Sequence, residues 1–350
     1  MMISVVGAGA IGKTISDYLS GNHEVAVVDL DAERLKKIKG IRWLAGTVDD
    51  HWEVLERSDV VLVALPGSVA FGVVKKLVSH GLKVVDISFS ENDPMELQDL
   101  AEDNNALLIP DAGFAPGLSN ILAGNLLKEG RYHSVEMYVA GLPQEKKPPL
   151  DYAVTWSVEG LIDEYTRPAR IIAERKLREV DPLDDISCFH VEGLGDFEAF
   201  YSDGLRTLLD SDRVVNMFEK TLRYPGHLAK IRFLREMGFF SDKKVSGTTV
   251  RKVSEQVFEK LRTGEKDVCI LIVRGIGKEN REFFCIDRYD DKNGVSSMSR
   301  MTGYTASVIA EAVIEGKVDG KGVLPPENIG YNEEAFDFIR KKLASKGIIF

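Results

Sequence analysis

The sequence predicts an α/β protein in which a doubly wound parallel sheet is followed by a second domain of α+β type. Three observations support this prediction. An apolar segment, Met2–Val6, runs into the glycine-rich turn Gly7–Gly12, and a helical pattern follows at Ile11–Leu19. Strand-like and helix-like segments then alternate up to about residue 115, which is typical of a parallel sheet covered by helices. After about residue 120 the order becomes irregular, which indicates the second domain.

Hydrophobic patterning and turn residues define the expected elements. The expected strands of the parallel sheet are Met2–Val6, Glu24–Asp29, Val60–Leu65, Lys83–Ile87 and Ala106–Pro110, with helices at Ile11–Leu19, Asp31–Lys39, Val69–His80 and Asp93–Asp103. The second domain is expected to contain strands Tyr132–Ala140, Asp196–Tyr201, Asp267–Ile276 and Arg281–Asp287, with helices Val158–Tyr165, Val214–Leu222 and Val250–Thr263. Two helices, Thr302–Glu315 and Asn332–Lys346, are expected to close the chain.

Composition restricts the class of protein. The chain has 350 residues, of which 44% are hydrophobic, so two domains with buried cores are possible. A net charge of −10 without a basic cluster argues against nucleic acid and anionic membranes as partners. The three cysteines, Cys188, Cys269 and Cys285, lack metal-ligand spacing, so we expect buried free thiols, no metal and a cytoplasmic protein. The many charged residues and few glutamines hint at a thermophilic source.

The turn Gly7–Gly12 lies between a strand and a helix, which is the context of a Rossmann dinucleotide site. Gly7 permits the tight turn, Gly9 lets the backbone approach a pyrophosphate, and Gly12 lets the helix pack on the strand. Asp29 ends the second strand about 20 residues later, where an acid binds the adenosine ribose. Because a carboxylate there would repel a 2′-phosphate, we expect NAD rather than NADP. The expected cofactor-binding residues, from this turn and from the carboxyl ends of the strands, are Gly7, Gly9, Ala10, Ile11, Gly12, Asp29, Leu30, Leu65, Pro66, Ser88, Phe89, Ala112 and Gly113.

Four segments carry a resemblance to a known family. They are Asp111-Ala-Gly-Phe-Ala-Pro-Gly-Leu-Ser-Asn120, Trp156-Ser157, Thr221-Leu-Arg-Tyr224 and Met301-Thr-Gly-Tyr304. With them the chain resembles the saccharopine reductase-like family over nearly its whole length, and most closely the lysine 6-dehydrogenase branch. The resemblance implies an NAD-binding Rossmann domain at 1–120, an α+β catalytic domain at 121–300, and helices at 301–350 that return to the Rossmann domain. It also implies a homodimer.

The resemblance further implies NAD-dependent oxidative deamination of the ε-amine of L-lysine. The products would be ammonia and 2-aminoadipate 6-semialdehyde, which cyclises to a piperideine carboxylate. Saccharopine reductases commonly carry an arginine after the Trp-Ser pair, whereas this chain has Val158-Glu159, and a Glu suits a cationic amine better. The alternatives are a saccharopine or carboxyspermidine-type imine reductase and, more remotely, a catalytically inactive NAD-binding protein.

This chemistry requires a base for the amine and a cation for the substrate carboxylate. The candidate bases are Asp86, Asp111, Glu159 and His227. The candidate carboxylate ligands are Arg206, Arg223 and Arg300, and Trp156 and Tyr224 are expected to wall the pocket. Each residue has a structural alternative: a turn cap, a helix-dipole partner, a buried histidine, an ion pair or core packing. The hairpin Asp267–Asp287 and the pair Phe239-Phe240 are expected either at a dimer interface or in the core.

Overall fold

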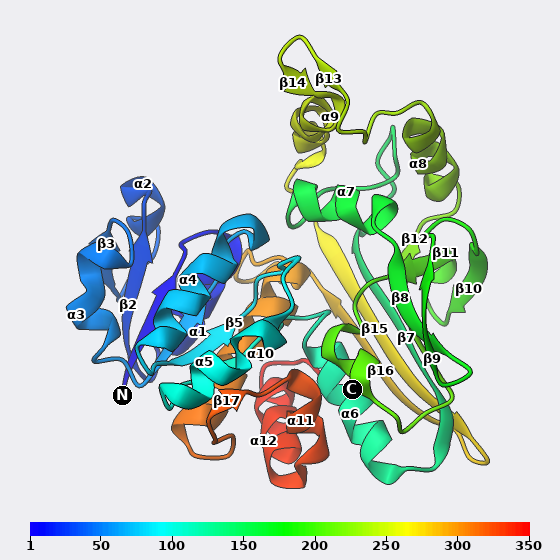
Figure 1. Ribbon diagram of the computed structural model, residues 1–350. Coiled ribbons are helices and arrows are strands. Elements are labelled where there is room, and N and C mark those ends of the chain that lie inside the picture. Colours follow the sequence, from blue (N-terminus) through cyan, green and yellow to red (C-terminus); the bar gives the residue numbers. More distant parts are fainter. The chain divides into compact units, whose positions relative to one another are not determined.

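The computed structural model describes residues 1–350, and the contacts within it divide the chain into two compact units. The first unit contains residues 1–128 and 299–350, and the second contains residues 129–298. Each unit is described separately below and can be followed by its labels in Figure 1. No helix is both long and apolar enough to cross a membrane.

The first unit is built on a seven-stranded sheet in the order β17-β6-β5-β4-β1-β2-β3, and all of its neighbouring strands are parallel (Figure 1). The strands are β1 Met2–Val6, β2 Glu24–Asp29, β3 Arg42–Ala45, β4 Val60–Val63, β5 Lys83–Asp86, β6 Leu107–Ile109 and β17 Gly322–Val323. Every residue of β4 is buried, as expected for a central strand covered on both faces. The chain reverses its direction across the sheet between β1 and β4, where such sheets bind ligands. The predicted fold class is confirmed.

Helices connect these strands. They are α1 Ala10–Leu19, α2 Ala32–Leu35, α3 Trp52–Leu55, α4 Gly67–Ser79, α5 Gln98–Asp103 and α6 Leu118–Glu129, with 3-10 turns at Asp49–His51 and Pro94–Leu97. Asp31 caps α2 as predicted by accepting hydrogen bonds from the N–H groups of Glu33 and Arg34. The helix itself is shorter than the predicted Asp31–Lys39.

The end of the chain completes the first unit through β17 and the helices α10 Ser297–Ile314, α11 Pro326–Tyr331 and α12 Glu333–Ala344. Gly303 of α10 faces α1, because a Cβ placed on it would lie 3.1 Å from the Cγ2 of Thr14. The rings of Tyr304 and Tyr18 also meet, with centroids 5.2 Å apart. The segment Met301–Tyr304, which contributed to the family resemblance, therefore packs α10 on α1, the first helix of this unit.

The second unit is built on an eight-stranded mixed sheet with the main order β10-β11-β12-β7-β15-β16 (Figure 1). The strands are β7 Tyr132–Pro143, β8 Ala169–Ala173, β9 Lys176–Val180, β10 Ser187–Val191, β11 Gly195–Ser202, β12 Asn216–Arg223, β15 Asp267–Gly277 and β16 Arg281–Arg288. The remaining elements are α7 Val158–Thr166, a 3-10 turn at Arg206–Asp210, α8 His227–Glu236, the hairpin β13 Lys244–Val245 and β14 Thr248–Thr249, α9 Val250–Phe258, and a 3-10 turn at Glu259–Leu261. The predicted hairpin at β15–β16 is confirmed.

Two predictions in the second unit are wrong. The segment Val214–Leu222, predicted as a helix, overlaps the strand β12, which pairs with β11 and β7. Its Glu and Lys residues gave it a helical appearance, but pairing with distant strands overrides local preference. Cys188 is exposed rather than buried, because it lies with His190 on the exposed face of β10, whereas Cys269 and Cys285 are buried.

Candidate cofactor and substrate sites

The glycine turn after β1 has the geometry that a pyrophosphate needs. Gly7 has a φ of +109°, and a Cβ on it would lie 2.3 Å from the carbonyl oxygen of Ala64 at the end of β4. A Cβ on Gly12 would lie 1.9 Å from the carbonyl oxygen of Gly7, so only glycine lets α1 pack on the turn. Gly9 precedes α1 and faces open space, and no side chain caps the helix. The N–H groups at the start of α1 are therefore available to an anion.

The carboxylate of Asp29 lies beside this turn at the end of β2. Its Oδ2 accepts a hydrogen bond from the N–H of Ala8 at 2.6 Å, and its Oδ1 accepts one from the N–H of Asp31 at 2.7 Å. The next residue, Leu30, is 78% exposed. Arg34, the nearest following base, forms an ion pair with Asp31 at 3.3 Å. The acid is thus fixed where a ribose would bind, and this arginine is engaged elsewhere.

The loops after β4, β5 and β6 lie at the same carboxyl edge of the sheet. Asp86 is buried, and its Oδ1 accepts hydrogen bonds from the N–H and the hydroxyl of Ser88 at 3.0 and 2.6 Å. The N–H of Ala112 donates to the carbonyl oxygen of Asp86 at 2.8 Å, which joins the loop of Asp111 to that of Asp86. Asp111 is 3% exposed and has a φ of +50°. The first unit therefore brings both predicted acids close to the end of β5, where one oxygen of Asp86 also caps a turn.

Other predicted cofactor residues line this edge with different exposures. Ser88, Ala112 and Gly113 are buried, whereas Ala10 is exposed. Pro66 is exposed as well, and the partly buried members of the set are Ile11, Leu65 and Phe89. A Cβ on Gly67 would lie 2.1 Å from the carbonyl oxygen of Phe89, so the start of α4 touches the loop after β5.

A buried chain of hydrogen bonds runs through the second unit. Arg223, at the end of β12, donates from Nε to the hydroxyl of Tyr165 at 2.9 Å. Tyr165 lies 2.9 Å from Nε2 of His227, whose Nδ1 lies 2.7 Å from the carbonyl oxygen of Leu150. Since that carbonyl can only accept, Nδ1 carries the proton and Nε2 accepts from Tyr165. The guanidinium of Arg223 also donates to Glu164 at 2.6 Å and to the carbonyl oxygen of Leu222 at 3.0 Å.

The electrostatics of this chain follow from its burial. Burial, together with the charge of Arg223, lowers the pKa of His227 to about 3, so the imidazole is neutral near pH 7. Burial alone would lower the pKa of Arg223, but Tyr165, Tyr152 and Glu164 raise it, so the guanidinium stays charged. Arg223 and His227 are 2% and 1% exposed. Both ring nitrogens of His227 and the guanidinium of Arg223 therefore form hydrogen bonds within the unit. This favours a structural role for these two residues over a role in catalysis or substrate binding.

The remaining candidates of the second unit lie nearer the surface. Glu159 is exposed on the first turn of α7, and Ser157 caps that helix by accepting from the N–H of Gly160. The indole of Trp156 lies over Gly160, because a Cβ there would be 2.5 Å from the ring. Tyr224 is partly buried and donates its hydroxyl hydrogen to the carbonyl oxygen of Pro143 at 2.8 Å.

The two remaining arginines belong to different units. Arg206 begins a 3-10 turn of the second unit with a φ of +54° and is 8% exposed. Arg300 belongs to the first unit, where it donates to the carbonyl oxygen of Lys346 at 3.1 Å. Glu164 and Glu219 were not predicted as site residues, because only their partners distant in the sequence reveal them.

The fold and the glycine turn define an NAD(P)-binding Rossmann protein. Residues 113–348 match the family described as Saccharopine dehydrogenase C-terminal domain, and residues 2–92 match Semialdehyde dehydrogenase, NAD binding domain. The chain belongs to the saccharopine dehydrogenase family, which confirms the resemblance inferred from its motifs and the expected oxidoreductase class. The particular closeness to lysine 6-dehydrogenase stays a prediction.

Similar proteins support this family over the whole chain. A saccharopine dehydrogenase [NADP(+), L-glutamate-forming] from Saccharomyces cerevisiae is 21% identical, with 98% of this chain and 97% of the relative aligned. The mitochondrial alpha-aminoadipic semialdehyde synthase of Rattus norvegicus is 20% identical over 99% of this chain, which spans only 47% of that relative. The apo structure of the Saccharomyces cerevisiae saccharopine dehydrogenase has the same fold, with a TM-score of 0.82 at 19% identity over 99% of this chain and 98% of that one.

Proposed function

We propose that this protein is an NAD-dependent dehydrogenase that oxidises the ε-amine of L-lysine. The family supports amino-acid oxidation, and the fixed carboxylate of Asp29 supports NAD over NADP. The observation that carries the choice of lysine is the exposed carboxylate of Glu159, next to Trp156-Ser157, where the resemblance would place an arginine. A carboxylate there attracts a cationic amine and repels a substrate carboxylate.

Different residues of the chain would bind the cofactor and remove the proton in this reaction. The turn Gly7–Gly12 and the start of α1 would hold the pyrophosphate, and Asp29 would hold the ribose. Bound NAD would accept the hydride from the carbon that carries the amine. The ε-ammonium, with a reference pKa of about 10.4, must first lose a proton, for which Asp86, Asp111 and Glu159 are the candidate bases. Loss of the hydride leaves an iminium, and water then adds to its carbon with loss of a proton. The resulting carbinolamine expels ammonia as its C–N bond breaks, which gives the aldehyde.

Saccharopine oxidation is the second candidate function. It is favoured by the Saccharomyces cerevisiae relative, which aligns with this chain over almost the full length of both proteins. That relative is named for NADP, whereas Asp29 disfavours a 2′-phosphate here. The buried network around Arg223 favours an internal role for this residue, which does not separate the two candidates, because both substrates carry a carboxylate.

A substrate panel tests the proposal. We expect NADH formation, followed at 340 nm, with L-lysine but not with saccharopine or carboxylated polyamines. We also expect kcat/KM with NAD to exceed that with NADP by at least tenfold, or about 1.4 kcal/mol of transition-state free energy. Turnover of saccharopine without turnover of lysine would overturn the assignment. Absence of turnover on every substrate, with tight NADH binding, would instead support the inactive NAD-binding alternative.

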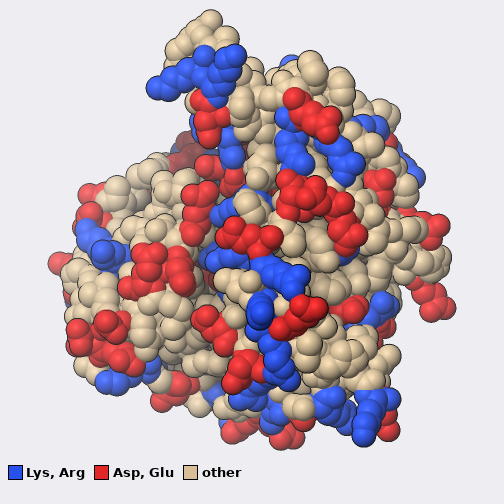
Figure 2. Space-filling model, turned by 45° about the vertical axis from the view of Figure 1, so that its right-hand side comes forward, with Lys and Arg blue, Asp and Glu red and all other residues tan.

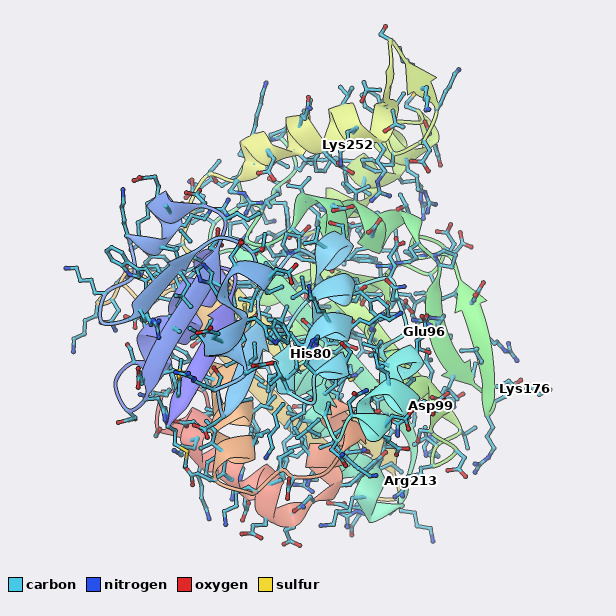
Figure 3. All side chains as sticks on the ribbon, turned by 60° about the vertical axis from the view of Figure 1, so that its left-hand side comes forward. His80, Glu96, Asp99, Lys176, Arg213 and Lys252 are labelled. Atoms are coloured by element: carbon cyan, nitrogen blue, oxygen red, sulfur yellow. The ribbon has the colours of Figure 1, made fainter.

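We propose a homodimer formed through the segment 227–262 of the second unit. Six of the thirteen exposed large hydrophobic residues lie there: Phe233, Met237, Phe239, Val245, Val253 and Val257. The segment has nine Lys and Arg against four Asp and Glu, whereas the whole chain has a net charge of −10. Figure 2 shows acidic and basic side chains interspersed over one face of the molecule. Figure 3 labels Lys252, which lies on α9 within this segment, and Glu96 and Asp99, which lie near α5 outside it. In a two-fold dimer each copy offers this same segment, so the exposed apolar side chains, and not the basic ones, would form the contact.

The test of the dimer is the mass in solution. We expect light scattering to give twice the chain mass of 38.8 kDa, and Val253→Asp with Val257→Asp to give the monomer. These residues share one face of α9, since they lie four positions apart. The matched control is Leu177→Asp, also at an exposed apolar residue of the same unit, which should stay dimeric. A monomeric wild type, or a dimeric double variant, would contradict this interface.

A further inference from the structure

A buried carboxyl group lies under the turn that leads to Arg206, one of the predicted carboxylate ligands. Glu219 of β12 is 3% exposed, and its Oε1 accepts a hydrogen bond from the hydroxyl of Ser202 at 2.8 Å. Ser202 in turn accepts from the hydroxyl of Thr221 at 2.9 Å. The other oxygen, Oε2, is buried and has no hydrogen-bond partner. A buried carboxyl oxygen without a partner is costly as a charge and tolerable as part of a neutral acid.

The carboxyl group supports the turn Ser202–Arg206 by direct contact. A Cβ on Gly204 would lie 2.0 Å from Oε1 of Glu219 and 2.3 Å from Oε2, so the glycine backbone rests on the acid. The next anchor of the turn is Asp203, which accepts from Nε and an Nη of Arg170 at 2.9 Å each. The turn then leads into Arg206, whose φ of +54° places it in a region that non-glycine residues seldom occupy.

We propose that Glu219 is a positioning residue: its neutral carboxyl group holds the Ser202–Arg206 turn, and thereby Arg206, in the shape that binds the substrate carboxylate. This inference rests on the proposed function, because it takes Arg206, one of the carboxylate ligands predicted from the sequence, as the residue that would bind the carboxylate of lysine. Glu219 does not touch the substrate in this scheme. It acts through the backbone of Gly204 and the hydroxyl of Ser202.

The charges around Glu219 make its protonation state important for the Ser202–Arg206 turn. Burial, with smaller contributions from the carboxylates of Glu164 and Asp203, raises the pKa of Glu219 to about 8. Glu164 on α7 is paired with Arg223, and Asp203 is paired with Arg170 on β8, so neither arginine serves Glu219 directly. The proton is held below pH 8 and lost above it. The new charge would then lie against Gly204 beside two other acids, which disfavours the turn.

The variant Glu219→Gln tests this, because an amide has nearly the same shape and stays neutral. We expect the KM for lysine to be similar in wild type and variant at pH 7. At pH 9 we expect the wild-type KM to be up to about tenfold higher than that of Glu219→Gln, with kcat in a constant ratio, since roughly nine-tenths of Glu219 would be ionised. Glu136→Gln, on the neighbouring strand β7, is the matched control and should follow the wild type. Equal KM values in wild type and Glu219→Gln at pH 9 would overturn the proposal.

Hydrogen–deuterium exchange separates this inference from the proposed function. We expect the peptide containing 202–206 to exchange faster in wild type than in Glu219→Gln at pH 9, and equally at pH 7. The comparison at one pH removes the intrinsic pH dependence of exchange. Lack of lysine turnover with this exchange pattern would overturn the substrate assignment alone. Equal exchange of the two proteins at pH 9 would overturn the role of Glu219 whatever the substrate.

Discussion

Replacing Arg223 by alanine is expected to destabilise the second unit by about 3–5 kcal/mol, because it removes one partner of a buried ion pair. Arg223 is 2% exposed and pairs with Glu164, whose side chain is 20% exposed, at 2.6 Å. The variant would leave the Glu164 carboxylate without its cation and the hydroxyl of Tyr165 without its donor. In calorimetry the Tm of this unit should fall by roughly 6–20 °C, at about 2–4 °C per kcal/mol.

Two comparisons distinguish this role from substrate binding. Arg178→Ala removes an ion pair with Glu174 whose side chains are 51% and 77% exposed, so we expect a change of at most about 0.5–1 kcal/mol. The double variant Glu164→Gln with Arg223→Met should be less destabilised than the two single changes added together, since the uncompensated charge is gone. If Arg223→Ala unfolds like wild type but has a much higher KM for lysine, Arg223 is a substrate ligand and the internal role is wrong.

The nucleotide-binding turn was predictable because its determinants are local in the sequence. Gly7, Gly9 and Gly12 follow a short apolar strand directly, and Asp29 ends the next strand, so the order of residues alone indicates the geometry. The structure adds the contacts that explain them, such as the approach of Gly7 to the carbonyl of Ala64. Five strands of the seven-stranded parallel sheet followed from the same kind of local alternation, whereas β3 and β17 were not predicted.

The second unit was less predictable because its determinants are distant in the sequence. Arg223, Tyr165 and His227 form one hydrogen-bonded chain, yet Tyr165 precedes the other two by 58 and 62 residues. Glu219 resembled a surface residue of a helix, and only the pairing of β12 with β11 and β7 places it under Gly204. The segment Thr221–Tyr224 could therefore be recognised as a motif from the sequence, whereas its buried position could be seen only in the structure.

Replacing Asp29 by alanine is expected to weaken NADH binding about 10–100-fold, because hydrogen bonds to a charged group contribute roughly 1.5–3 kcal/mol. The carboxylate would bind the ribose of NADH and would repel the additional phosphate of NADPH. NADPH should therefore bind the variant as well as or better than the wild type. Fluorescence titration with both nucleotides measures this change in preference. The control is Asp17→Ala, which removes an exposed acid of α1 that pairs with Lys13 and should change neither affinity.

The same carboxylate also holds the glycine turn, and the two roles predict different results. Asp29 accepts from the N–H of Ala8 at 2.6 Å, so its loss frees a backbone group within the turn that would carry the pyrophosphate. If anchoring the turn were the only role of Asp29, the affinities of the alanine variant for NADH and for NADPH would fall by the same factor. A wild type that already binds NADPH more than tenfold tighter than NADH would contradict the choice of NAD. A loss of affinity for NADH but not for NADPH would establish that Asp29 binds the ribose, because the pyrophosphate is common to both nucleotides.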